Sequence, residues 1–135
     1  MSDIGENYKY CERIRDRLVA TYEGRVKRCL ECGGIVVDPD GVCQCGEMHD
    51  IGDWEPVLLL EDEYIYDVEY RIGRDFEYRS VSLMVAVGGP SIYIDTESGN
   101  VELFWGSERA TAWIPSEVTD EIDDIYREIY ESTRN

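Results

Sequence analysis

The sequence predicts an α+β domain with an antiparallel sheet of four or five strands, a helix at each end of the chain and a small cysteine-bearing hairpin. Apolar residues recur at helical spacing near both ends, and the second half contains segments with a period of two. Four cysteines gather in two close pairs before those segments. With 135 residues, 43% of them hydrophobic, the chain suits a single domain, 1–135, that carries residues 27–53 as an insertion.

The N-terminal helix is predicted over residues 6–23. One helical face carries Tyr8, Cys11, Leu18 and Tyr22, at positions separated by whole turns. Gly24 follows as a helix stop. We expect Cys11, on the apolar face, to be a small core residue and not a nucleophile.

The sheet is predicted from five β-rich segments, at 64–72, 79–87, 91–96, 101–105 and 110–114. In the first, "YIYDVEYRI", apolar and charged residues alternate, so that Tyr64, Tyr66, Val68, Tyr70 and Ile72 share one face and Asp67, Glu69 and Arg71 the other. The second, "RSVSLMVAV", is more continuously apolar, as expected of a central strand. Turn residues in "GGP", "ESGN" and "GSER" separate the later segments, which predicts a meander.

The C-terminal helix is predicted from "PSEVTDEIDDIYREIYEST". Pro115 ends the preceding strand, and Ser116 is placed to cap the helix. The face expected to lie against the sheet holds Val118, Ile122, Ile125 and Ile129, while an acidic stripe elsewhere holds Asp120, Asp124, Glu128 and Glu131. Tyr126 and Tyr130 are expected to pack at the edge of the core.

The cysteine segment, "RCLECGGIVVDPDGVCQCGE" at 28–47, places two thiol pairs ten residues apart, joined by a short hairpin. Two thiolates on a tight turn followed by glycines suit a zinc knuckle, and the hairpin returns the second pair beside the first. The segment resembles the zinc ribbon and rubredoxin-like knuckle family. The ligands predicted on this basis are Cys29, Cys32, Cys43 and Cys45.

The second pair departs from that family, because it reads C-x-C where two intervening residues are usual. His49 is therefore an alternative to one cysteine ligand. Four thiolates leave no open coordination position, so the predicted Zn²⁺ is structural and not catalytic. A redox C-x-x-C is the competing interpretation, but nothing places Cys29 at the start of a helix that follows a strand.

The formal net charge is −17, from 30 acidic and 13 basic residues. Residues 61–135 contribute −12 of it, from eighteen acids and six bases, so most of the charge lies outside the cysteine segment. A basic approach with Arg25, Lys27 and Arg28 precedes the hairpin, but acids in and after it, and the overall charge, oppose direct binding of nucleic acid. Adaptation to a high-salt cytoplasm is an alternative explanation, since eleven of the thirteen bases are arginine.

Residues 85–132 carry "GGPSIYIDT" followed by "VELFWG". This pattern resembles small acidic proteins of phages and mobile elements, of anti-restriction or anti-CRISPR type. The resemblance implies a setting in which such proteins inhibit host nucleases by occupying their DNA-binding channels. It carries over no functional residues.

The functional hypothesis is an acidic, non-enzymatic inhibitor of a nucleic-acid-binding enzyme, a CRISPR or restriction nuclease, that acts by DNA mimicry or channel occlusion. Acids interleaved with tyrosines suit a protein interface. The predicted partner-binding residues are Asp67, Glu69, Asp75, Glu77, Asp120, Asp124, Glu128 and Glu131. The alternative is a zinc-stapled adaptor or regulatory subunit that acts through its hairpin without mimicry.

The N-terminal segment lacks the apolar core of a signal peptide, and no apolar run approaches the roughly 18 residues of a membrane span. We therefore expect a soluble, cytosolic protein with no membrane contact. The oligomeric state, the partner and the source stay open.

Overall fold

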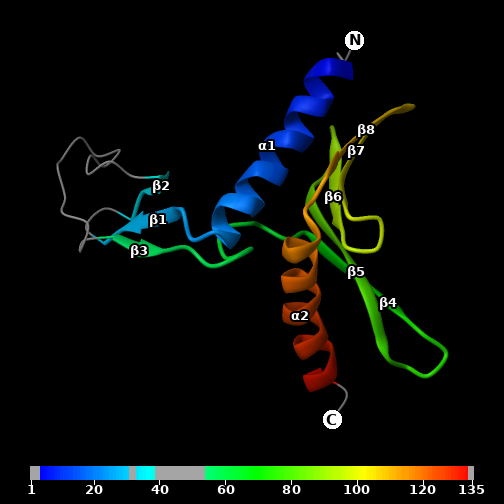
Figure 1. The fold of residues 1–135 in the computed structure, drawn as a ribbon. Coiled ribbons are helices and arrows are strands. Elements are labelled where there is room, and N and C mark those ends of the chain that lie inside the picture. The colour runs from blue at the N-terminus through cyan, green and yellow to red at the C-terminus, as the bar shows by residue number, and fades with distance from the viewer. Residues whose placement is uncertain (1–3, 31–32, 39–53, 134–135) are drawn as a thin grey trace. The chain divides into compact units, whose positions relative to one another are not determined.

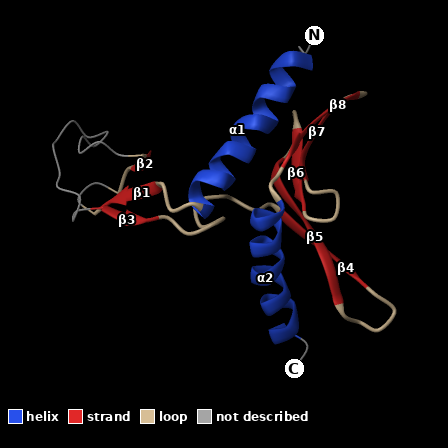
Figure 2. Cartoon of the chain, viewed as in Figure 1, coloured by secondary structure: helices blue, strands red, loops and turns tan. Residues whose placement is uncertain are grey.

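The computed structural model describes residues 4–30, 33–38 and 54–133. The fold is α+β, with two helices and two antiparallel sheets, of three and five strands (Figure 1, Figure 2). The predicted α+β class, with a helix at each end and an antiparallel sheet of five strands, is confirmed, while the zinc-ribbon-like hairpin stays a prediction. The chain divides into two compact units, one formed by Met1–Asp16 with Glu63–Asn135 and the other by Arg17–Asp62. A single domain with an insertion at 27–53 stays a prediction.

The larger unit contains the five-stranded sheet, a meander in which each strand pairs with its neighbours along the chain. Its strands are β4 (Asp67–Ile72), β5 (Tyr78–Ala86), β6 (Ser91–Asp95), β7 (Asn100–Trp105) and β8 (Glu108–Trp113). All five predicted segments are strands. The first was predicted three residues too long, because Tyr64 and Tyr66 are exposed and stack edge to face, with ring centroids 4.6 Å apart, before the strand begins.

Alternation along the strands gives this sheet two chemically different faces. The inner face is apolar and is formed by Val68, Tyr70, Val81, Leu83, Ile92, Ile94, Val101, Leu103, Ala110 and Ala112. A β-bulge shifts the register between Arg71 and Ile72, which pair with Ser80 and Tyr78 respectively. The bulge lets Tyr78 join Tyr70 on the inner face, where their rings are 6.3 Å apart.

Helix α2 (Ser116–Thr133) packs on the inner face through buried Val118 and Ile122. Ile129 was expected on the same face but is 43% exposed. Tyr126 and Tyr130 take the inward positions in the last turns, and their rings lie 6.2 and 5.6 Å from that of Tyr70. The prediction for Ile129 was therefore wrong, while the packing role expected of the two tyrosines is confirmed.

Helix α1 (Ile4–Tyr22) agrees with the helix predicted at 6–23. Its first part lies on the same side of the sheet as α2 (Figure 1), with Asn7 and Cys11 buried. The Asn7 side chain donates to Glu108 over 3.4 Å, and Arg15 donates to the Trp113 carbonyl over 3.3 Å, which fixes this part of α1 to β8. Burial raises the pKa of the Cys11 thiol to about 11, which suits the core role predicted for it.

The smaller unit begins in the last turns of α1, which end in a Schellman motif. Gly24, at φ +75°, donates to Thr21, and Arg25 donates to Ala20 over 2.9 Å. A three-stranded sheet follows, with β1 (Val26–Cys29) between β2 (Ile35–Val37) and β3 (Trp54–Pro56). Its small core is Ala20, Val26 and Val57, with Ile35 packed against it.

Among the described residues, no helix combines the length and apolar character required to cross a membrane.

Candidate partner-binding surface

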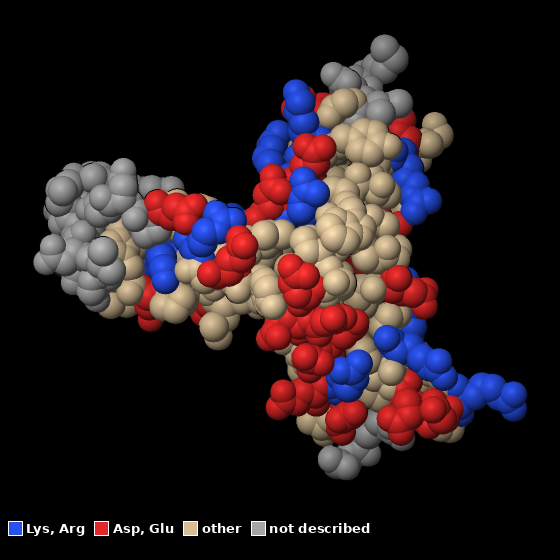
Figure 3. All heavy atoms as spheres, viewed as in Figure 1, with Lys and Arg blue, Asp and Glu red and all other residues tan. Residues whose placement is uncertain are grey.

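The exposed side of α2 is strongly acidic. The helix contains seven carboxylates and one arginine, and Figure 3 shows the acidic residues gathered over this element. Among the residues that the structure describes, no ion pair engages the following exposed acids: Glu117, Asp120, Glu121, Glu128 and Glu131. Asp124 pairs with Arg127 over 3.0 Å, and Asp123 accepts a hydrogen bond from Tyr78. Most of the negative charge on α2 is therefore not neutralised by a neighbouring cation.

A second acidic element, the β4–β5 turn, lies beside the C-terminal half of α2. The Tyr130 hydroxyl donates to the Phe76 carbonyl over 2.8 Å, which ties this turn to the helix. Asp75 shapes the turn by accepting the Glu77 amide over 3.1 Å, and Phe76 has φ +63°. The structure therefore brings Asp75 and Glu77 close to one end of the helical stripe of acids.

The predicted partner-binding residues do not form one surface. Asp120, Asp124, Glu128 and Glu131 line α2, with Asp75 and Glu77 near its end. Asp67 and Glu69 lie on the face of β4 opposite the helices, called here the outer face, because they alternate with Val68 and Tyr70. All eight side chains are exposed. The sheet thus separates two of them from the other six.

A cluster of four tyrosine rings fixes α2 to the sheet: Tyr70, Tyr78, Tyr126 and Tyr130. Tyr78 is its most constrained member, since its hydroxyl donates to Asp123 over 2.7 Å and Arg127 lies 5.1 Å above its ring. Burial, and then the bond to Asp123, raise the pKa of the Tyr78 phenol far above its usual value. The acids of α2 are therefore presented by a helix that this cluster holds against the sheet.

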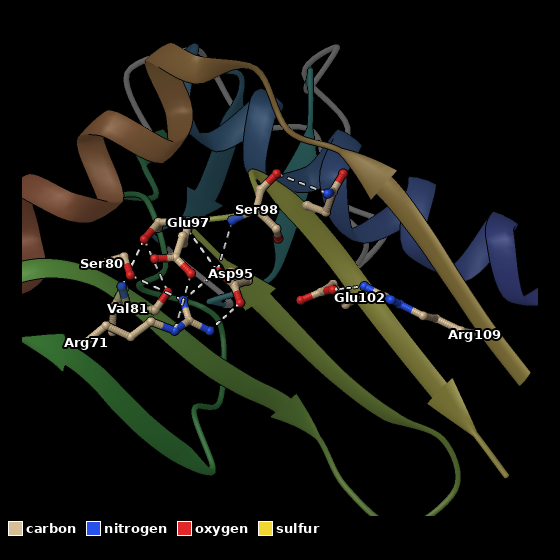
Figure 4. Close-up of polar contacts among 10 residues, drawn as sticks. Arg71, Ser80, Val81, Asp95, Glu97, Ser98, Glu102 and Arg109 are labelled. Atoms are coloured by element: carbon tan, nitrogen blue, oxygen red, sulfur yellow. Dashed lines mark hydrogen bonds and ion pairs between the residues drawn. The ribbon is translucent and has the colours of Figure 1, made fainter. Parts of the chain in front are cut away.

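Polar contacts on the outer face, shown in Figure 4, were missed by sequence reasoning. Arg71 donates two hydrogen bonds to Asp95, over 2.9 and 2.6 Å, and Asp95 also accepts the amides of Glu97 and Ser98. Burial opposes ionisation of Asp95, but Arg71 and these amides outweigh it and hold the pKa of the carboxyl below its usual value. The two residues are 24 positions apart, so only the strand register reveals the pair.

Of the predicted zinc ligands, Cys29 is described, and Cys32, Cys43, Cys45 and His49 lie outside the described residues. Cys29 is buried at the end of β1. Its carbonyl accepts the Gly33 amide and its amide donates to the Gly34 carbonyl, both over 2.8 Å, with Gly33 at φ +76°. The zinc knuckle itself stays a prediction. Within the described ranges, no three His, Cys, Asp or Glu side chains form a group that could hold a metal.

No protein family matches the chain, and no curated protein or solved structure is significantly similar to it. The resemblances over residues 28–47 and 85–132 stay predictions.

Proposed function

We propose that this protein inhibits a nucleic-acid-binding enzyme, a CRISPR or restriction nuclease, by placing the acidic side of α2 in the basic channel that normally holds DNA. The single observation that carries the proposal is the set of exposed, unneutralised carboxylates along α2, held on a helix that the tyrosine cluster fixes in place. A positively charged channel is the complementary surface for such a helix.

The spacing of the carboxylates supports mimicry of a phosphate row. Asp120, Asp124 and Glu128 follow one another at intervals of four residues, or about 6 Å of helix rise. Duplex DNA presents one phosphate per strand about every 3.4 Å of axis, so the two densities of negative charge are of the same order. The acids of the β4–β5 turn, Asp75 and Glu77, extend the charged surface at one end of the helix.

The role is that of a binding protein and not of an enzyme. Association with an arginine- and lysine-lined channel uses exposed charge on a rigid support and needs no catalytic group. The resemblance of residues 85–132 to small acidic phage proteins adds support, because that stretch includes all but the last residue of α2.

The experiment is an inhibition assay on a panel of purified CRISPR and restriction nucleases. The variant D120N/D124N/E128Q/E131Q removes four charges from α2, and E6Q/E12Q/D16N/E23Q removes four exposed charges from α1 and the residue that follows it. Both variants change the net charge from −17 to −13. We expect the α2 variant to lose at least about tenfold in potency while the control keeps most of its inhibition, since the four α2 charges face the channel.

Two outcomes contradict this proposal. Equal loss in both variants would mean that net charge matters and the position of the charge does not. Full inhibition by the α2 variant would exclude α2 as the contact surface.

A zinc-stapled adaptor role is the second candidate, and exposed aliphatic side chains in the smaller unit favour it. They are Leu30, Val37 and Leu58. Ile35 and Val36 are partly buried, so substitutions there would disturb the fold as well as an interface. If the adaptor role holds, V37S/L58S abolishes partner binding and the α2 variant retains it.

Zinc is proposed as the staple of the smaller unit, held by Cys29 with Cys32, Cys43 and Cys45. The ion would cross-link the smaller unit, whose described core consists of only three residues and one packed neighbour. Metal analysis should find about one zinc per chain, lost in C29S and in C43S with unfolding of this unit. Full metal retention in both variants would refute the ligand assignment.

A further inference from the structure

The outer face of the five-stranded sheet carries a group of large side chains that the α2 surface does not use. Tyr93 on β6 pairs with Glu102 on β7, and Phe104 on β7 pairs with Arg109 on β8. Trp113, further along β8, points to the same side by alternation. We call this group, Tyr93, Glu102, Phe104, Arg109 and Trp113, the ring patch. In the larger unit, both helices lie on the other side of the sheet (Figure 1).

The aromatic members of the ring patch present apolar surface to solvent. Trp113 is 63% exposed and Phe104 is 39% exposed, and the Tyr93 and Phe104 rings meet edge to face at 5.9 Å. Clustered aromatic side chains rimmed by polar groups are typical of protein interfaces, where Trp, Tyr and Arg contribute a large share of the binding energy.

The centre of the ring patch already holds a guanidinium. Glu102 is nearly buried, with 11% of its side chain exposed, and it pairs with Arg109, whose side chain is 59% exposed. The Arg109 guanidinium carbon also lies 5.4 Å from the centre of the Phe104 ring. A carboxylate and an aromatic ring thus hold one arginine at the surface by an ion pair and a cation–π contact. This arrangement shows that a carboxylate and an aromatic ring on the outer face can bind a guanidinium group.

The remaining charge on the outer face selects a cationic partner. Arg71 and Arg109 on this face are paired, with Asp95 and Glu102 respectively, while Arg79 beside the bulge of β5 is exposed. Asp67 and Glu69 are exposed and form no ion pair with a described residue. A second copy of the chain would bring the same excess of acids and a net charge of −17, so self-association is disfavoured.

We propose that the outer face is a docking surface for an arginine-bearing segment of a partner protein. Phe104 and Trp113 stack with its guanidinium groups, and Asp67 and Glu69 form ion pairs with others. The distance from β4 to β7 is three strand spacings, about 14 Å, which an extended segment of about five residues crosses. This surface is separate from the acidic side of α2, so either proposal can fail without the other.

The test uses fluorescein-labelled peptides with four arginines spaced by glycine and serine, and the same peptide with four lysines. Binding is measured by fluorescence anisotropy. The variant F104A/W113A removes the stacking surfaces, and W105A is the matched control, because Trp105 is also exposed but alternates to the other side of β7. D67N/E69Q is a second variant, with both changes at exposed positions that leave the core intact.

We expect the wild type to bind the arginine peptide at least about fivefold more tightly than the lysine peptide, because only guanidinium stacks well on the rings. F104A/W113A and D67N/E69Q should each weaken arginine-peptide binding about fivefold or more, and W105A should not. Retained thermal unfolding transitions confirm that each variant is folded.

Three results would overturn the inference. One is equal affinity for both peptides, which indicates charge attraction alone. Another is loss of binding only in D120N/D124N/E128Q/E131Q, which assigns the peptide to α2. The third is a wild-type dimer in sedimentation that F104A/W113A converts to a monomer, which assigns the face to self-association.

Discussion

At the scale of single residues, the Tyr78 hydroxyl has the most specific role in the tyrosine cluster. It donates to Asp123 from a buried position, whereas Tyr126 is held by packing of its ring. Replacing Tyr78 by phenylalanine removes only the hydroxyl group. The Asp123 carboxylate then loses its donor while the ring stays in place.

We expect Tyr78→Phe to lower the free energy of unfolding by about 1.5–3 kcal/mol, the range for a hydrogen bond to a charged group. Tyr126→Phe is the control and should change it by less than about 0.5 kcal/mol. Urea unfolding of both variants measures the difference. Similar values for the two would show that the bond between Tyr78 and Asp123 contributes little.

Asp95 gives a pH-dependent prediction. Its pKa is lowered in the folded protein by Arg71 and two amides, so its contribution to stability is complete above the unfolded-state pKa of about 3.9. That contribution is lost as the pH falls through the lower folded-state pKa. We expect Asp95→Asn to cost about 2 kcal/mol at pH 7, below the range for fully buried pairs because Arg71 is partly exposed.

The measurement is the difference in unfolding free energy between wild type and Asp95→Asn from pH 7 to pH 2. The difference should be constant down to about pH 4 and shrink below it. A difference that persists unchanged at pH 2 would mean that packing, and not the ionised carboxylate, explains the loss.

At the scale of secondary-structure elements, α2 has acids at both ends and no basic residue in its last turn. The helix dipole favours a carboxylate at the N-terminus and disfavours one at the C-terminus. Glu117 and Glu131 are both exposed. Their charges therefore contribute to the free energy of unfolding with opposite signs.

We expect Glu117→Gln to destabilise the protein and Glu131→Gln to stabilise it, each by about 0.3–1 kcal/mol at low salt. Thermal unfolding at 20 mM and 1 M NaCl tests this, and both effects should nearly vanish at the higher salt. Changes of the same sign for both substitutions would contradict this assignment.

Elements in which apolar residues recur at a regular spacing could be predicted from the sequence, whereas side-chain contacts between strands could not. Both helices and all five strands of the larger sheet follow from their spacing of apolar residues, because one face of each is buried. Ile129 was misplaced because helical spacing alone does not tell whether isoleucine or tyrosine turns inward. The pairs Arg71 with Asp95 and Glu102 with Arg109 depend on register, which β-bulges shift within this sheet.

At the scale of the whole molecule, the acids behind the net charge of −17 lie on surfaces that differ in how many of them are paired with cations. Most acids of α2 form no ion pair with a described residue, whereas those of the outer face alternate with paired arginines and exposed rings. In the smaller unit, Arg25 and Arg28 each pair with two carboxylates. Within the described parts of the chain, α2 thus carries the largest group of acids without an ion pair, and there we propose mimicry of DNA.

Competition with DNA for the partner nuclease tests this central claim most directly. Binding of the protein to the nuclease is measured with and without saturating duplex DNA, at 50 and 300 mM NaCl. DNA mimicry predicts that DNA blocks the protein and that affinity falls at least about tenfold with the added salt, because screening weakens contacts between opposite charges. Equal binding to the DNA-loaded and free nuclease, with no salt dependence, would contradict it.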